Sequence, residues 1–226
     1  MQPATLMEQV YRDLRAKVEL GELAPGSQLV NRTLCKELGV STIPLREAIQ
    51  RLTSEGLVNH IPNAGAFVRR IDRRELLQLF ELRNWMELFA LERAAARIDE
   101  DHLEQLEYIC TKWRQMAHAM RDSDHDALKG DDNRTWIGLD IKFHNILIEV
   151  SGNVWLKKVA EDLRIMSRIA ISKPEEMKLG RAARNCRIHA GIVRGLRRRD
   201  LALANYWMER HNSFSLAFAK EMAVEA

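Results

Sequence analysis

The sequence has few of the features that mark secreted or membrane proteins. Aromatic residues make up 6% of its 226 residues, and the three cysteines, Cys35, Cys110 and Cys186, are isolated with no Cys-x-x-Cys spacing. Isolated cysteines indicate reduced thiols in a cytoplasmic protein. No apolar run approaches the ~18 residues of a membrane helix. Glu8 and Asp13 stand where a signal peptide would need an apolar core. We therefore expect a cytoplasmic protein without a membrane segment.

Neither sign of charge dominates. The chain carries 35 Lys and Arg residues against 32 Asp and Glu, a net charge of +3. Any surface for nucleic acid must therefore come from the placement of basic residues rather than from their excess. A hydrophobic fraction of 46% is enough to build real cores, and the length suits one large domain or two ordinary ones.

Turn signals divide the first 70 residues into short elements. Apolar residues at helical spacing predict a helix over 6–20. A second helix is expected from Asn31, as N-cap, to Gly39, and a third is capped by Ser41. Two short extended runs around Pro62–Gly65 predict a β-hairpin. This order of elements is that of a winged helix-turn-helix.

The rest of the chain predicts only helices. Asp72 with Glu75 and Asp101 with Glu104 have capping-box spacing, and the polar stretch 122–135 predicts a loop. The fold class is therefore mainly α, with an N-terminal winged helix-turn-helix and its small β-hairpin followed by an all-α helical bundle. The expected domains are 1–70 and 71–226, with a boundary near 70–75. Further helices are expected at 136–150, 153–171, 180–198 and 201–222.

The third helix carries the side chains suited to base recognition. Such a helix enters the major groove, where Arg46 can bind guanine or phosphate and Gln50 can pair with adenine. Arg32 begins the preceding helix, where phosphate is favoured, and the hairpin tip Asn63–Gly65 can approach the minor groove. The alternative is that Arg46 and Arg51 form a solvated face and pair with Glu47 and Glu55.

These residues also resemble a known family. The segments YRDLRAKVELGELAPGSQL, LGVSTIPLREAIQRLTSEGLV and PNAGAFV are similar to the DNA-binding domain of the GntR family of bacterial transcription regulators. The resemblance implies that Arg32, Thr42, Arg46 and Gly65 lie at the DNA. Thr42 stands where the family usually has arginine, and Ala64 where a basic residue is frequent, so the family's usual operator does not carry over.

Three helices of the second half carry histidines on their apolar faces. Asp140 and His144 are four residues apart in DIKFHNILIEV, while His189 and His211 lie on the apolar stripes of two later helices. One carboxylate and three imidazoles facing a common core predict a single site for Zn²⁺, Ni²⁺, Fe²⁺ or Mn²⁺. The alternative for each histidine is a hydrogen-bonded core residue.

The second half resembles the FCD effector domain of the FadR subfamily. The similarity rests on DIKFHNILIEVSGN and the pair His189 and His211, and it implies a metal on Asp140, His144, His189 and His211 with a small carboxylate effector beside it. Arg83 and Glu87 match an Arg-x-x-x-Glu of the family's first effector helix. Arg83 is therefore a candidate partner for the effector's carboxylate, and an ion pair with Glu87 is the alternative.

Three functions compete on these grounds. The first is a homodimeric transcription regulator that binds a pseudo-palindromic operator in double-stranded DNA and responds to a small organic acid. The resemblance implies a repressor. The second is a metal-dependent enzyme using the Asp/His3 site to activate water, although no additional acid or base lies beside the ligands in sequence. The third is a purely structural dimerisation bundle with incidental histidines. The five tryptophans fall at helical spacing, which predicts core packing for most of them, with Trp207 lining a cavity.

Overall fold

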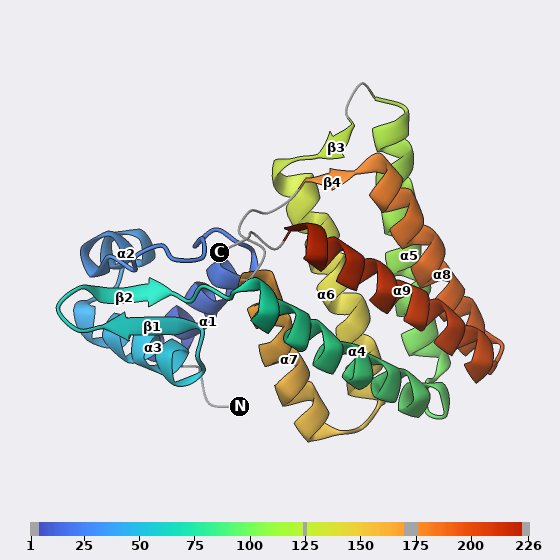
Figure 1. The fold of residues 1–226 in the computed structure, drawn as a ribbon, viewed down its shortest axis with the longest axis horizontal. Helices are drawn as coiled ribbons and strands as arrows, with labels where there is room; N and C mark the ends of the chain where they lie inside the picture. Colours follow the sequence, from blue (N-terminus) through green and yellow to red (C-terminus); the bar gives the residue numbers. More distant parts are fainter. Residues whose placement is uncertain (1–4, 124–125, 170–175, 223–226) are drawn as a thin grey trace. The chain divides into compact units, whose positions relative to one another are not determined.

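The computed structural model describes residues 5–123, 126–169 and 176–222. These residues form two compact units (Figure 1). The first comprises 5–79 with 162–169 and 221–222, and the second comprises 80–161 and 176–220. Helices dominate both, which confirms the mainly α fold class with one small hairpin near the N-terminus. Among the described helices, none combines the length and the apolar character needed to cross a lipid bilayer.

The first unit contains the expected helix-turn-helix and wing. Its elements are α1 (Leu6–Glu19), α2 (Asn31–Leu38), α3 (Thr42–Ser54), β1 (Val58–Ile61) and β2 (Gly65–Val68). The two strands pair antiparallel, as the turn residues predict, with Ile61 opposite Gly65. The inner faces of the helices meet in one core that includes the fully buried Leu14, Leu45 and Leu52. This core sets the angle at which α3 presents its outer face.

The second unit is built from long helices around a separate core. They are α4 (Arg73–Ala95), α5 (Glu100–Arg121), α6 (Gly130–Val150), α7 (Val154–Ile169), α8 (Leu179–Arg197) and α9 (Leu201–Met222). The first residues of α4 and the last of α7 belong to the first unit. Helix α5 packs along α6 and α8, and the core includes the fully buried Trp113, Trp136 and Phe143.

Several sequence expectations about element ends were wrong. Val30, not Asn31, is the N-cap of α2, and Asp99, not Asp101, caps α5 by accepting the backbone N–H of His102. The expected loop 122–135 is shorter, because α6 already begins at Gly130. Residues 124–125 of that loop and 170–171 of the expected helix 153–171 lie outside the described residues.

The second unit also contains a strand pair that periodicity did not predict. β3 (Ala127–Leu128) and β4 (Met177–Lys178) pair antiparallel just before α6 and α8 begin. Asn133 stabilises this pair, since its Oδ1 accepts the backbone N–H of Met177. The start of α6 is therefore tied to the start of α8, and these two helices carry three of the four predicted metal ligands.

Candidate DNA-binding face and metal centre

A hollow lies between the outer face of α3 and the hairpin. Its volume is about 540 Å³, and its walls include Asn31, Arg46, Gln50, His60 and Gly65. Three of these, Arg46, Gln50 and Gly65, were predicted DNA contacts, and the fold brings them together. Asn31 and His60 were not predicted. No periodicity in the sequence marks His60, because in β1 Val58 is buried and the next three residues are all exposed.

Arg46 and Arg51 have different surroundings, which separates the two sequence hypotheses for them. The Arg51 guanidinium lies over the Tyr11 ring, 3.9 Å from its centroid, and its Nε is 3.4 Å from Glu55. The Tyr11 hydroxyl donates to the same carboxylate at 2.7 Å. Arg51 therefore helps to hold α3 against α1, as the ion-pair alternative predicts. Arg46 is exposed and has no ion pair within the described residues, so its donors are available to another molecule.

The remaining predicted DNA residues lie at the starts of α2 and α3 and at the hairpin tip. Arg32 and Thr42 are exposed in the first turns of α2 and α3. Asn63, at the hairpin tip, and Gly65 have positive φ angles of 62° and 106°. Gln28 donates from its Nε2 to the carbonyl of Ala64 at 2.8 Å, which anchors the tip. A Cβ on Gly65 would lie 3.3 Å from the same Nε2, so the tip is also closely packed.

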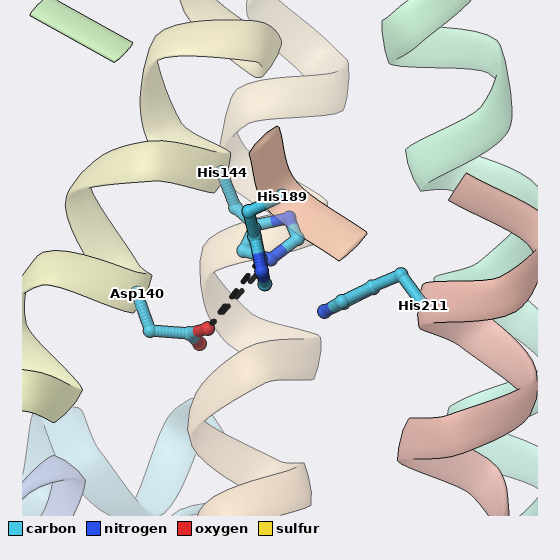
Figure 2. A group of neighbouring side chains, drawn as sticks. All are labelled: Asp140, His144, His189 and His211. Atoms are coloured by element: carbon cyan, nitrogen blue, oxygen red, sulfur yellow. Dashed lines mark ion pairs between the residues drawn. The ribbon is translucent and has the colours of Figure 1, made fainter. Parts of the chain in front are cut away.

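Four side chains from α6, α8 and α9 converge in the second unit (Figure 2). Asp140, His144, His189 and His211 each offer one ligand atom, and these atoms all lie within 4.8 Å of one another. The Asp140 Oδ1 is 3.9 Å from the Nε2 of His144 and 4.0 Å from the Nε2 of His189. The three histidines are buried, whereas Asp140 is partly exposed. The structure thus gathers all four predicted ligands, with Asp140 on the solvent side.

Each histidine has its Nδ1 beside an acceptor. His189 donates from Nδ1 to the carbonyl of Asn185 at 2.9 Å. The Nδ1 of His144 lies 3.5 Å from Glu87 Oε1, and the Nδ1 of His211 lies 3.6 Å from Glu87 Oε2. A protonated Nδ1 leaves Nε2 with its lone pair. Among the described residues, the buried Nε2 atoms of His144 and His189 have no hydrogen-bond partner, as expected for nitrogens oriented to bind a metal.

Electrostatics favours the form of these histidines that can bind a metal. Burial lowers the pKa of His144 to about 4 and that of His189 to about 3. Their imidazoles are therefore neutral near pH 7, and neutral imidazole is the ligand form. The rings are also held in place, because the centroid of His189 lies 4.6 Å from that of Trp113 and 4.7 Å from that of Phe143.

Arg83 and Glu87 lie beside this cluster on α4. Glu87 is only 7% exposed, and Arg83 donates from Nε to its Oε1 at 2.8 Å. Burial opposes the charged form of Glu87. Arg83, His144 and His211 nevertheless hold the pKa of this carboxyl well below its usual range. The ion pair between Arg83 and Glu87, which was the alternative to effector binding, is therefore present in the structure. Only Nε takes part in it, so both Nη groups remain without a hydrogen-bond partner among the described residues.

The donor set fits a divalent transition metal. Three imidazole nitrogens and one carboxylate oxygen suit Zn²⁺, Ni²⁺, Fe²⁺ or Mn²⁺. A metal that takes five or six ligands could bind an additional one beside these four. The two buried, unpartnered Nε2 atoms are costly in a core unless something binds them. These residues could thus hold a metal ion.

Comparisons with known proteins agree with this geometry. Residues 6–68 match the family model "Bacterial regulatory proteins, gntR family", and residues 78–214 match the FCD domain. The chain belongs to the GntR family and carries an FCD domain. This family consists of regulators of transcription rather than enzymes, which argues against the metal-dependent enzyme.

Individual relatives are similar at moderate identity. The HTH-type transcriptional repressor RspR of Escherichia coli K12 is 28% identical over 211 residues, which are 90% of this chain and 84% of RspR. A transcriptional regulator in an unstable DNA locus of Streptomyces ambofaciens is 34% identical over 148 residues. The match covers 65% of this chain and only 57% of that relative's length. The structure of E. coli McbR/YncC superimposes with a TM-score of 0.83 at 20% identity, over 97% of this chain and 99% of that one, which supports the fold.

Proposed function

We propose that this protein is a ligand-responsive transcription repressor of the FadR subfamily. Two copies bind a pseudo-palindromic operator in double-stranded DNA, and the FCD domain senses a small organic acid through a bound divalent metal. The observation that carries this proposal is the conjunction of Arg46, which has no ion pair within the described residues, with the buried Asp/His cluster. The name of RspR supports repression, and a protein that binds operator DNA is expected in the cytoplasm.

The charges at the cluster support a carboxylate effector. Asp140 and Glu87 contribute two formal negative charges and Arg83 contributes one positive charge, and imidazoles bind a metal in their neutral form. A divalent metal turns this net charge from −1 to +1. A charge left unpaired in a partly buried site is costly, so one carboxylate group is the complement that neutralises it. The open Nη groups of Arg83 match the two oxygens of such a group.

The effector acts only if it binds two arrangements of the protein with different affinity. Helix α4 has its first residues in the first unit and carries Arg83 and Glu87 in the second. A ligand that binds Arg83 therefore contacts a helix whose first residues belong to the DNA-binding unit. We assign the change in DNA affinity to this helix.

Replacement of Arg46 tests the DNA-binding role. Fragments selected from a random DNA pool by the wild-type protein should share a pseudo-palindromic sequence. On such a fragment, Arg46→Ala should weaken binding by about 1–3 kcal/mol at fixed salt, and it should lower the salt slope by about one if Arg46 binds phosphate. Fluorescence anisotropy at several salt concentrations measures both.

The matched control is Arg12→Ala, which removes one positive charge from the exposed face of α1. Among the residues that the structure describes, Arg12 bonds only to the carbonyl of Glu8 on its own helix. The Arg12→Ala protein should lose much less affinity for the DNA fragment than the Arg46→Ala protein does. Equal binding by the wild type and Arg46→Ala at matched salt would remove Arg46 from the DNA interface.

A further inference from the structure

Glu87 stands between two of the three histidines and does more than pair with Arg83. It comes from α4, whereas His144 and His211 come from α6 and α9. Its two carboxylate oxygens face different rings, with Oε1 3.5 Å from the Nδ1 of His144 and Oε2 3.6 Å from the Nδ1 of His211. One side chain thus reaches the outer edge of both imidazoles.

The ion pair with Arg83 does not account for this placement. Within the part of the chain that the structure describes, Arg83 donates to Oε1 alone, and the buried Oε2 accepts no hydrogen bond. A buried carboxylate oxygen without a donor is destabilising, and a simple ion pair would favour a bidentate geometry that satisfies both oxygens. The Nδ1 of His211 lies 3.6 Å from Oε2, so this oxygen faces the His211 ring.

The protein fixes the orientation of the His211 ring by a second contact. Its Nδ1 lies 3.3 Å from the Oδ1 of Asn212. The amide of Asn212 is oriented by its Nδ2, which donates to the carbonyl of Asn84 on α4 at 3.3 Å. Both neighbours of Nδ1 are therefore acceptors, so Nδ1 carries the proton and Nε2 the lone pair.

We propose that Glu87 is a positioning residue for the metal centre. Its Oε1 faces the Nδ1 of His144 and its Oε2 faces the Nδ1 of His211, which orients both rings with Nε2 available to a metal. This inference rests on the proposed metal site and assigns a new role to a residue that sequence reasoning treated only as the partner of Arg83. Outer carboxylates of this kind orient a ligating imidazole and increase its basicity, and their loss weakens metal binding about 10–100-fold.

The test compares Glu87→Gln with Glu81→Gln. Glu81 is exposed on the same helix, so its variant controls for the loss of one carboxylate from α4. Competition with a chromogenic chelator gives the Zn²⁺ affinity. Long-range ¹H–¹⁵N spectra of the imidazoles report which ring nitrogen carries the proton, and a purely structural role of Glu87 would not change that. Far-UV circular dichroism verifies folding.

We expect Glu87→Gln to keep one zinc site and to lose about 10–100-fold in affinity, with the Nδ1–H signals of His144 and His211 altered. Glu81→Gln should match the wild type. If the unpaired Arg83 prevents folding, the double variant Arg83→Gln/Glu87→Gln carries the test, because it removes both charges. Wild-type zinc affinity and unchanged imidazole signals in the Glu87 variants would overturn the proposal.

Failure of the metal site itself is a distinguishable outcome. A wild-type protein that binds no Zn²⁺ would contradict the proposed function. The spectrum of the metal-free wild type would still decide the role of Glu87. Nδ1–H on both His144 and His211, lost on replacement of Glu87, would support it. A proton on Nε2 of either ring in the wild type would overturn it.

Discussion

Cys110 and Cys186 show how the core of the second unit controls side-chain chemistry. Cys110 is buried on α5, and Cys186 is half-buried on α8. Burial raises the pKa of Cys110 to about 12 and that of Cys186 to about 11. The thiolate is the reactive form of cysteine, so both thiols are held in their unreactive form. None of the three cysteines is in a disulfide in the described residues.

Alkylation should therefore be selective in the folded protein. With iodoacetamide at pH 8, Cys35 should react first, and Cys110 should react at least about ten-fold more slowly, because a smaller fraction is thiolate and access is restricted. Peptide mass spectrometry over time gives the three rates, and the same reaction in denaturant is the control. Equal native rates at Cys35 and Cys110 would show that the core around α5 is open.

The Asp140, His144, His189 and His211 cluster could be predicted from the sequence, but its surroundings could not. Asp140 and His144 share a helix face because they are four residues apart, and the apolar stripes place His189 and His211 inward. The role of Glu87 depends on α4 meeting α6 and α9, and no local pattern encodes that contact. The core prediction for the tryptophans was wrong for Trp85 and Trp155, which are 74% and 72% exposed. The Trp207 ring lies against Gly191 of α8, where an added Cβ would overlap its Cδ2, and a cavity beside this ring stays a prediction.

At the scale of elements, the helices α8 and α9 are held together by close backbone contact. A Cβ on Gly195 of α8 would lie 2.5 Å from the backbone nitrogen of Ala204 on α9. Backbone atoms cannot move aside as a flexible side chain can. Only glycine at position 195 therefore allows this separation of the helices that carry His189 and His211.

Gly195→Ala should destabilise the protein by about 1–3 kcal/mol, because the added methyl group forces α8 and α9 apart. The matched control is Gly138→Ala in the interior of α6, where an added Cβ meets nothing within 4 Å. That change should be neutral or stabilising by up to about 1 kcal/mol, since alanine favours a helix. Urea unfolding measures both. A Gly195→Ala protein as stable as Gly138→Ala would contradict the packing of these helices.

An element could be predicted from the sequence when the residues that determine it lie close together in the chain. The hairpin is marked by its own turn residues, and α3 by the Gly39–Ser41 corner that precedes it. The β3–β4 pair was missed because each strand has two residues and its partner lies far away in the chain, so neither shows a period. The start of α5 was misplaced because Asp99 and Asp101 are both good caps, and only the backbone of residue 99 is extended at the helix start.

At the scale of the whole molecule, the proposed function requires two copies. One recognition helix contacts only a few base pairs, so specificity comes from two half-sites related by the two-fold axis of a dimer. Helix α4 carries an exposed apolar stripe, Leu82, Trp85 and Phe89, at positions i, i+3 and i+7. If two copies bind the operator as proposed, this stripe is where we expect the second copy to pack. The predicted domain boundary near residues 70–75 lies between the residues matched by the two family models, 6–68 and 78–214, and remains a prediction.

Trp85→Glu should weaken the dimer at least about ten-fold, because a central tryptophan contributes 2 kcal/mol or more to many interfaces. Tyr108→Glu is the matched control, since Tyr108 is exposed on α5 and lies outside the stripe. Sedimentation velocity over a concentration series gives both dissociation constants. A Trp85→Glu protein with the wild-type constant would place the dimer contact elsewhere.

The central claim is that the FCD domain of this protein holds one metal ion. Elemental analysis of the purified wild-type protein beside His189→Gln tests it most directly. The account predicts about one divalent transition metal per chain in the wild type and its loss in the variant, with DNA binding retained by both. No metal in either protein, or equal metal in both, would contradict it and leave the Asp140, His144, His189 and His211 cluster as core packing.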